Sequence, residues 1–220
     1  MATDPPRLVS IQVGLPAVHG EPAAEDPRDR PWRTGFYKSP VVGAVWLGRT
    51  NLAGDGQAAL GPHGGPDKAV LAYAASHYSA WRAELELPDL NYGAFAENFT
   101  VASLAEDRVC IGDVFAIGQT RVQVSQPRAP CWKIARRWRI PDLTRRVEAT
   151  GRTGWYLRVL EEGYVEAGQP VELLARPHPE WTVARAAAVA RDREAHSEPA
   201  ACLAALPELS AAWRTALAGG

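Results

Sequence analysis

The chain has 220 residues, of which 46% are apolar and 22% charged, and its formal net charge is −1. This length fits one domain with an appendage or two small domains, and the near-neutral charge gives no reason to expect nucleic acid or membrane as a partner. No apolar run approaches the roughly 20 residues of a membrane helix, and residues 1–6 lack the regions of a signal peptide, so we expect a cytoplasmic protein.

Short strands are predicted along the first 175 residues, where alternating or β-branched runs are bounded by Gly and Pro. They cover residues 8–15, 41–47, 69–73, 99–101, 109–111, 114–117, 120–124, 155–160 and 170–175. Gly118-Gln119 is typical of a tight hairpin, whereas the Pro- and Asp-rich segment 16–31 is expected to be a surface loop. So many short strands predict a β-rich α+β fold built on a β-barrel or a strongly bent sheet.

Two helices are predicted between these strands, and more in the tail. Ser76 is expected to cap a helix at 77–87 that Pro88 stops, and residues 132–138 have helical spacing. After residue 179 the Ala/Leu-rich segments 182–190, 197–206 and 210–217 predict a three-helix appendage. The domains are therefore expected to be a barrel at 1–178, with its core at about 35–175, and a helical extension at 179–220.

Cys131 is the cysteine with a polar, structured neighbourhood. It leaves a β-type run through Pro127 and Pro130, which stiffen the loop because each proline fixes its own φ. Cys131 is therefore expected near a helix N-terminus. Cations surround it in the sequence: Arg128, Lys133, Arg136 and Arg137. Such surroundings favour a thiolate, which attacks electrophiles or binds metals.

The other two cysteines, Cys110 and Cys202, lie in apolar runs and are expected to be buried as small hydrophobic residues. The three cysteines form no CxxC pair and cannot supply four ligands to an iron–sulfur cluster.

Four further motifs, at 34–40, 61–70, 96–100 and 151–156, are punctuated by Gly or Pro or precede a strand. The densest combines His63 and Lys68 with Gly64-Gly65, whose amides suit a phosphate, although a plain Gly-rich turn explains it about as well. For Glu97 and Asn98, taken alone, a role as polar turn residues is the better explanation. The cations of these motifs suit a polyanionic ligand near Cys131: Lys38, Lys68, Arg128, Lys133 and Arg152. No G-x-G-x-x-G motif or P-loop indicates a nicotinamide, flavin or ATP site.

Three uses of Cys131 compete. A peptidase-type nucleophile needs a base such as His63 or His77, but neither lies in a peptidase-like signature. A redox thiol needs a resolving cysteine, and none is near in the sequence. A ligand to a metal whose other ligands come from a cofactor requires the fewest missing parts.

The motifs resemble, in the same order, those of the MOSC domain family and its YiiM-type members. The matching segments are 63–70, 97–100, 123–133 and 151–158, within a likeness from about 35 to 175, and the helical tail is similar to that subgroup's C-terminal extension. The resemblance implies a MOSC-type β-barrel that binds the molybdenum cofactor (Moco), with Cys131 as the metal-ligating cysteine beside the cofactor's dithiolene. It also implies a pyridoxal phosphate-independent oxidoreductase that detoxifies N-hydroxylated compounds such as 6-hydroxylaminopurine by two-electron N–O reduction.

The resemblance and the charges together assign roles. Cys131 is expected to ligate the metal, while His63 and Asn98 orient the substrate or relay protons, with structural hydrogen bonding as the near-even alternative. The expected cofactor-binding residues are Lys38, His63, Gly64, Lys68, Asn98, Arg128, Cys131 and Lys133.

The expected partners are a small N-hydroxylated substrate and a separate flavin or iron–sulfur electron-donor protein that docks near Cys131. Docking and dimerisation are both open uses of the helical tail, so a homodimer is among the expected states. A carrier that binds Moco or sulfur without reductase turnover is the alternative function.

Overall fold

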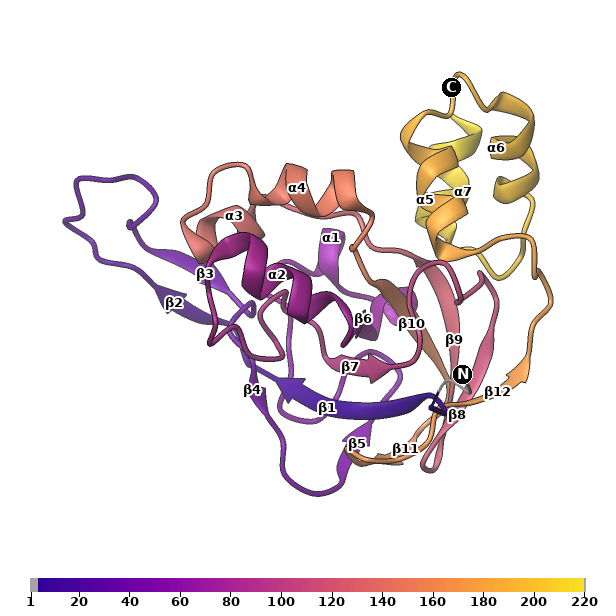
Figure 1. Cartoon of the computed structure of the whole chain (residues 1–220), viewed down its shortest axis with the longest axis horizontal. Coiled ribbons are helices and arrows are strands. Elements are labelled where there is room, and N and C mark those ends of the chain that lie inside the picture. Colours follow the sequence, from indigo (N-terminus) through magenta and orange to yellow (C-terminus); the bar gives the residue numbers. More distant parts are fainter. Residues whose placement is uncertain (1–3, 220) are drawn as a thin grey trace.

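The computed structural model describes residues 4–219, which form a curled sheet, a layer of short helices and a C-terminal helical bundle (Figure 1). Eight strands make the main sheet in the order β12-β8-β9-β10-β6-β7-β1-β4. Their bounds are β1 Arg7–Val13, β4 Ser39–Pro40, β6 Val70–Ala74, β7 Phe99–Ala102, β8 Val114–Ile117, β9 Thr120–Pro127, β10 Trp155–Glu161 and β12 Glu172–Ala175. All neighbours are antiparallel except β6 and β7, which are parallel.

Backbone hydrogen bonds also join the two sides of this sheet at one end. The amide of Leu8 in β1 donates to Gln169 O at 2.9 Å, and the amide of Val171 donates to Pro6 O at 3.0 Å, just before β12 begins. The sheet therefore curls into a half-barrel, which confirms the predicted β-rich α+β fold with a strongly bent sheet.

Two small sheets extend this body. Strands β5 (Val45–Leu47) and β11 (Gly163–Val165) pair below the barrel, and β2 (Ala17–His19) pairs with β3 (Trp32–Thr34). The β2–β3 hairpin and the residues between its strands form an arm at one end of the molecule, opposite the helical bundle (Figure 1). The prediction of a surface loop throughout 16–31 was wrong at residues 17–19.

Several predicted strands are shorter than expected. The run 41–47 is a strand only from Val45, because Gly43 takes a left-handed φ of +82°. Residues 109–111 make a single bridge between Cys110 and Thr182, because Gly112 turns the chain with φ +83° and Asp113 binds the Cys110 amide at 2.9 Å. The hairpin at Gly118-Gln119 is confirmed by the pairing of Ile117 with Thr120.

Short helices cover one side of the half-barrel. They are α1 (Leu60–His63), α2 (His77–Leu85), α3 (Lys133–Trp138) and α4 (Leu143–Thr150), with a 3-10 turn at Pro66–Lys68. Helix α2 ends two residues before the predicted 87, because Glu86 adopts a left-handed φ of +56°, and the Ser76 side chain makes no capping bond within residues 4–219. Neither α1 nor α4 was predicted.

The tail forms three helices, as predicted: α5 (Val183–Arg191), α6 (Ser197–Ala204) and α7 (Ala211–Ala218). The side chains of Thr182 and Ser210 cap α5 and α7 by accepting from backbone amides. The tail shares one hydrophobic core with the barrel, since Val183 and Leu203 are buried in the same cluster as Leu8 and Val122. Cys202 is exposed, so the prediction that it is buried was wrong, whereas the predicted burial of Cys110 is confirmed.

A second core lies under α2, α3 and α4, and Glu97 organises the loop that borders it. The buried Glu97 carboxylate accepts from Gly93 N at 2.7 Å, Phe95 N at 3.2 Å and Thr100 Oγ1 at 3.1 Å, and also from the Tyr78 hydroxyl. One carboxylate thus satisfies donors from the loop, from α2 and from β7. Within residues 4–219, no helix is both long and apolar enough to cross a membrane.

We expect Glu97→Ala to lower the free energy of unfolding by about 3 kcal/mol or more, because several buried donors lose their acceptor at about 1–3 kcal/mol each. The exposed Glu148→Ala on α4 is the control, and its effect should stay within about 0.5 kcal/mol. Urea unfolding followed by circular dichroism measures both. Similar stability of the two variants would contradict the role given to Glu97.

Candidate functional site

One cavity brings together residues from all five sequence motifs, the stretch around Cys131 included. Its empty space is about 610 Å³, part of it open to solvent, which is within the usual size of a small-molecule site. The residues that line it are Thr34, Gly35, Phe36, Lys38, Gly56, Gln57, Ala58, His63, Lys68, Leu71, Ala96, Asn98, Arg128, Ala129, Cys131, Lys133 and Tyr156. Of the predicted site residues, Gly64 alone is outside this lining.

Cys131 sits on the loop between β9 and α3, just before the first turn of the helix. Its carbonyl accepts from Ile134 N at 3.1 Å and from the Thr144 hydroxyl of α4 at 3.1 Å. Two helices therefore fix the backbone of this half-buried cysteine, and the prediction that it precedes a helix is confirmed.

Arg128 provides a buried cation in the same cavity as the Cys131 thiol. Its amide donates to Gly154 O at 3.1 Å, and the side chain is buried, with the residue only 5% exposed. In the described part of the chain, its Nη1 atom has no hydrogen-bond partner. A buried, unpaired guanidinium nitrogen is costly, so this atom is poised to donate to a ligand that enters the cavity.

His63 lies at the end of α1 and faces three cations across the cavity. Partial burial lowers its pKa from 6.5 to about 4, and the charges of Lys133, Lys68 and Arg128 act in the same direction. The imidazole is therefore neutral at pH 7, and its Nδ1 atom is buried without a partner among residues 4–219. A neutral imidazole has both a donor and an acceptor nitrogen to offer a ligand.

Two of the three lysines that line the cavity, Lys68 and Lys38, have different hydrogen-bond partners. Lys68 donates from Nζ to Pro62 O at 2.8 Å, and burial lowers its pKa while Asp67 opposes the shift. The Lys38 ammonium forms a buried ion pair with Asp55, and the exposed fractions of the two side chains are 6% and 0%. Burial lowers the pKa of Lys38, against the attraction of Asp55.

The Asn98 side chain lines the cavity and is held by three backbone and side-chain groups. Its Nδ2 donates to Asp55 Oδ2 at 2.9 Å and to Gln12 O at 3.2 Å, and its Oδ1 accepts from Leu71 N at 3.1 Å. Both amide hydrogens are thus engaged, which leaves one lone pair of Oδ1 for a substrate. A role of Asn98 in orienting substrate stays a prediction, while its structural hydrogen bonds are clear.

Several residues expected near the cavity lie elsewhere. Arg152 stacks over Trp81 at 4.5 Å and pairs with Glu84 at 2.7 Å, so its inclusion among the cations near Cys131 was wrong. His77 binds Glu106 at 2.7 Å outside the cavity lining, which removes it as a base for Cys131. The Gly64 amide donates to Leu60 O at 2.8 Å, which agrees with the alternative of a plain Gly-rich turn at this residue.

The cavity also contains residues that the sequence reasoning did not select. Phe36 and Leu71 supply apolar walls, and Gln57 adds an amide from a loop without a motif signal. Tyr156 could have been selected from the sequence, because it is the last residue of the motif at 151–156. Burial raises the pKa of its phenol, so it remains protonated at neutral pH.

Metal-binding side chains do not cluster in this structure. Among residues 4–219, no group of three or more His, Cys, Asp or Glu side chains is placed to hold a metal ion. A metal at Cys131 would therefore take its remaining ligands from a bound molecule or from solvent.

Residues 60–172, just over half of the chain, match the MOSC domain. The chain is 50% identical over 157 residues to YflK of Bacillus subtilis, which is 71% of each chain. It is 39% identical over 159 residues to YiiM of Escherichia coli, 71% of this chain and 70% of that protein. A protein of Gibberella moniliformis named reductase is 39% identical over 163 residues, 73% of this chain but only 29% of that longer protein.

The crystal structure of YiiM from Geobacillus stearothermophilus is similar at a TM-score of 0.80 and 34% identity, over 97% of this chain and 98% of that one. The crystal structure of YiiM from Escherichia coli is similar at a TM-score of 0.70 and 34% identity, over 82% of this chain and 86% of that one. The chain therefore belongs to the MOSC domain family, which confirms the resemblance in its motifs.

We expect the pKa of His63 to rise from about 4 toward 6.5 in Lys133→Ala, because one of the repelling charges is gone. An NMR titration of the imidazole C–H signals measures this, with His63→Gln to assign the resonance. Since the unfolded chain binds the proton more readily, His63 lowers stability as the pH falls from 6.5 to 4. A wild-type pKa of 6 or above would contradict this electrostatic description.

We expect Asp55→Ala to lower the free energy of unfolding by about 3–5 kcal/mol, because it strands a buried ammonium. Lys38→Met should cost less, since the carboxylate keeps its bonds from Gly14 N at 2.9 Å and from Asn98. Urea unfolding of the two variants gives the order, and a smaller loss for Asp55→Ala than for Lys38→Met would contradict it.

Proposed function

We propose that this protein is a Moco-dependent reductase of N-hydroxylated compounds, with Cys131 as the protein ligand of the metal. The observation that supports it best is the combination, in one cavity, of a thiol with an unpartnered, buried Arg128 nitrogen. A soft metal favours the thiol, and an anionic group satisfies the guanidinium. MOSC domains are known to bind Moco, which agrees with this donor set.

The cavity residues fit such a cofactor by their charge and hydrogen-bonding capacity. Arg128 and Lys133 would hold its anionic parts together with Lys68, and His63 would contribute one donor and one acceptor. Gln57 and the backbone near Ala129 offer further polar groups for a pterin edge. When bound, the cofactor supplies the two-electron redox chemistry of the site.

The chain's own residues would then bind substrate and handle protons. Reduction of an N–OH group to N–H consumes two electrons and two protons and releases one water. The phenol of Tyr156 and the neutral imidazole of His63 lie on the cavity wall and can hold protons there. Phe36 and Leu71 give an apolar wall that would exclude water and accept the flat face of a substrate.

The electrons would come from another protein. The sequence contains no nicotinamide or flavin motif, and its three cysteines cannot hold an iron–sulfur cluster. The relative named reductase, of which the match spans 29%, supports a reductive function for a chain with this domain. We also propose a cytoplasmic location, where the free thiols of Cys110, Cys131 and Cys202 stay reduced.

We expect the wild-type protein, made in a host that synthesises Moco, to contain about one molybdenum per chain, because Cys131 supplies one ligand. Cys131→Ala should lose the metal, while the exposed Cys202→Ala keeps it. Arg128→Gln should retain roughly ten- to hundred-fold less cofactor, because a charge-assisted hydrogen bond contributes about 1.5–3 kcal/mol. Molybdenum analysis and fluorescence of the extracted pterin measure both.

Turnover of 6-hydroxylaminopurine with dithionite-reduced methyl viologen completes the test. Full metal content without turnover would overturn the reductase and leave a carrier. Full metal content in Cys131→Ala would overturn the assignment of the metal ligand.

A further inference from the structure

The surface beside Cys131 carries an exposed tryptophan on a rigid base. Trp132 follows Cys131 directly and is 55% exposed, and its ring lies 5.5 Å from that of Trp32 in the arm. The guanidinium of Arg136 stacks over both rings, at 4.8 Å from Trp32 and 5.6 Å from Trp132. A half-exposed indole held in one orientation loses little entropy when a partner covers it.

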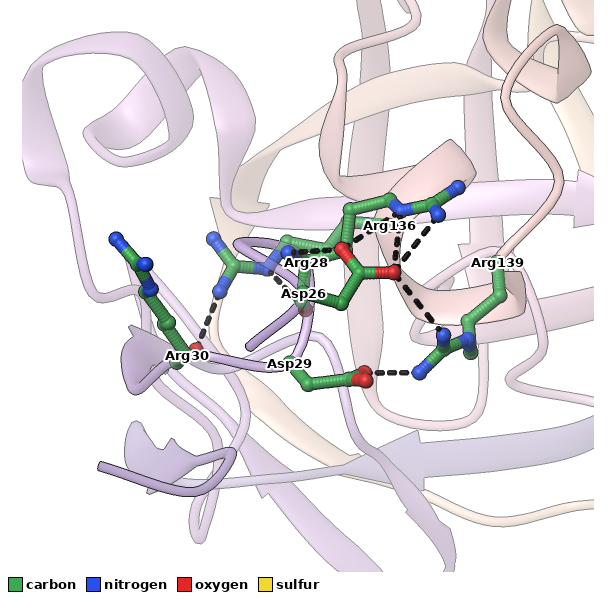
Figure 2. A network of polar contacts seen from close by, with 6 residues as sticks. All are labelled: Asp26, Arg28, Asp29, Arg30, Arg136 and Arg139. Atoms are coloured by element: carbon green, nitrogen blue, oxygen red, sulfur yellow. Dashed lines mark hydrogen bonds and ion pairs between the residues drawn. The ribbon is translucent and has the colours of Figure 1, made fainter. Parts of the chain in front are cut away.

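The arm is tied to helix α3 by a network of arginines (Figure 2). Arg139 pairs with Asp29 and, at 3.3 Å, with Asp26, which also binds Arg28 at 2.7 Å. Arg136 donates from Nε to Arg28 O at 3.2 Å and also to the carbonyl of Arg30. The arm and α3 therefore form one continuous surface around Trp132, with a groove lined by Arg28, Arg136, Arg139 and two prolines.

This surface has an excess of positive charge. Residues 25–30 and 132–140 together contain six arginine and lysine residues and three carboxylates, although the whole chain has a net charge of −1. Within residues 4–219 the Arg136 guanidinium pairs with no carboxylate, since its polar contacts are backbone carbonyls. Tryptophan and arginine are the residues that most often dominate binding energy in protein interfaces.

We propose that this surface, the α3 face formed by Trp132 and the cations of 25–30 and 132–140, docks a small electron-transfer protein with acidic residues around its redox centre. The proposal rests on the proposed function, which needs an external reductant. Trp132 is the residue after Cys131 in the sequence. The covalent path from a donor bound at Trp132 to the proposed metal ligand would therefore be short. Charge complementarity would set the on-rate and the salt dependence of the encounter.

The stoichiometry fixes what the partner must supply. Each N–O reduction takes two electrons and two protons and yields the N–H compound and one water. Two one-electron donors, such as two flavodoxin hydroquinones, are oxidised per turnover, and water supplies the protons.

The experiment uses the cofactor-loaded protein with 6-hydroxylaminopurine and two kinds of donor. Dithionite-reduced methyl viologen needs no docking, whereas flavodoxin and a [2Fe–2S] ferredoxin, each kept reduced by NADPH and its reductase, do. The test variant is Arg30→Gln/Arg139→Gln on the α3 face. The matched control is Arg185→Gln/Arg214→Gln in the helical bundle at the other end of the molecule, which changes the net charge by the same amount (Figure 1).

At about 50 mM salt, we expect the test variant to raise the KM for a protein donor about five- to ten-fold, and the control to stay within about two-fold. The difference should vanish near 1 M salt, where the Debye length is about 3 Å. With methyl viologen, both variants should match the wild type. Trp132→Ala should lower the ratio of flavodoxin-driven to viologen-driven turnover roughly ten-fold.

Equal KM values for the test and control variants would overturn the docking surface. Failure of both flavodoxin and ferredoxin to give saturable turnover, while methyl viologen works, would overturn it too. Absence of turnover with methyl viologen would instead count against the proposed reductase itself.

Discussion

The carboxylate of Asp55 joins three distant parts of the chain beneath the cavity. It accepts from Gly14 N at the end of β1, from the Lys38 ammonium before β4, and from Asn98 at the start of β7. Because a buried charge without partners costs several kcal/mol, each of these segments stabilises the positions of the others. The backbone near this cluster is also tightly packed, since a Cβ on Gly35 would come within 2.3 Å of Gly56 O. The floor of the cavity, and hence the shape of the site, depends on this cluster.

The same cluster divides the cavity electrostatically. At the floor, Lys38 shares its charge with Asp55, so it attracts an anion less than its formal charge implies. Elsewhere in the lining, the Nη1 atom of Arg128 has no hydrogen-bond partner among residues 4–219, and Lys133 and Lys68 lie close enough to lower the pKa of His63. These cations would attract an anionic group more strongly than Lys38 does. The neutral His63 adds no charge to the cavity.

The sequence was sufficient for the residues whose type is tied to local chemistry. Cys131, Arg128, His63 and the three lysines stood out by rarity, by Gly or Pro spacing and by family motifs, and all line one cavity. The predictions that were wrong or missing concerned residues whose positions depend on tertiary contacts. Arg152 lies in the same motif as Tyr156, but it precedes β10, and its guanidinium stacks over Trp81 and pairs with Glu84 instead. Asp55 and Gln57 had no motif, since their roles arise from partners more than 15 residues away or from cavity shape. The arm was missed because β2 and β3 have only three residues each.

The hydrogen bonds that join β1 to residues 168–171 have a consequence for how the chain folds. Strand β1 pairs with β7, and its other neighbours include a segment more than 150 residues later. The half-barrel thus closes only after residue 171 has been synthesised, and contacts of such high sequence separation slow folding. Until then, β1 presents an unpaired edge and an apolar face, with Leu8 and Ile11 awaiting the core. An incomplete chain could pair with another chain along this edge.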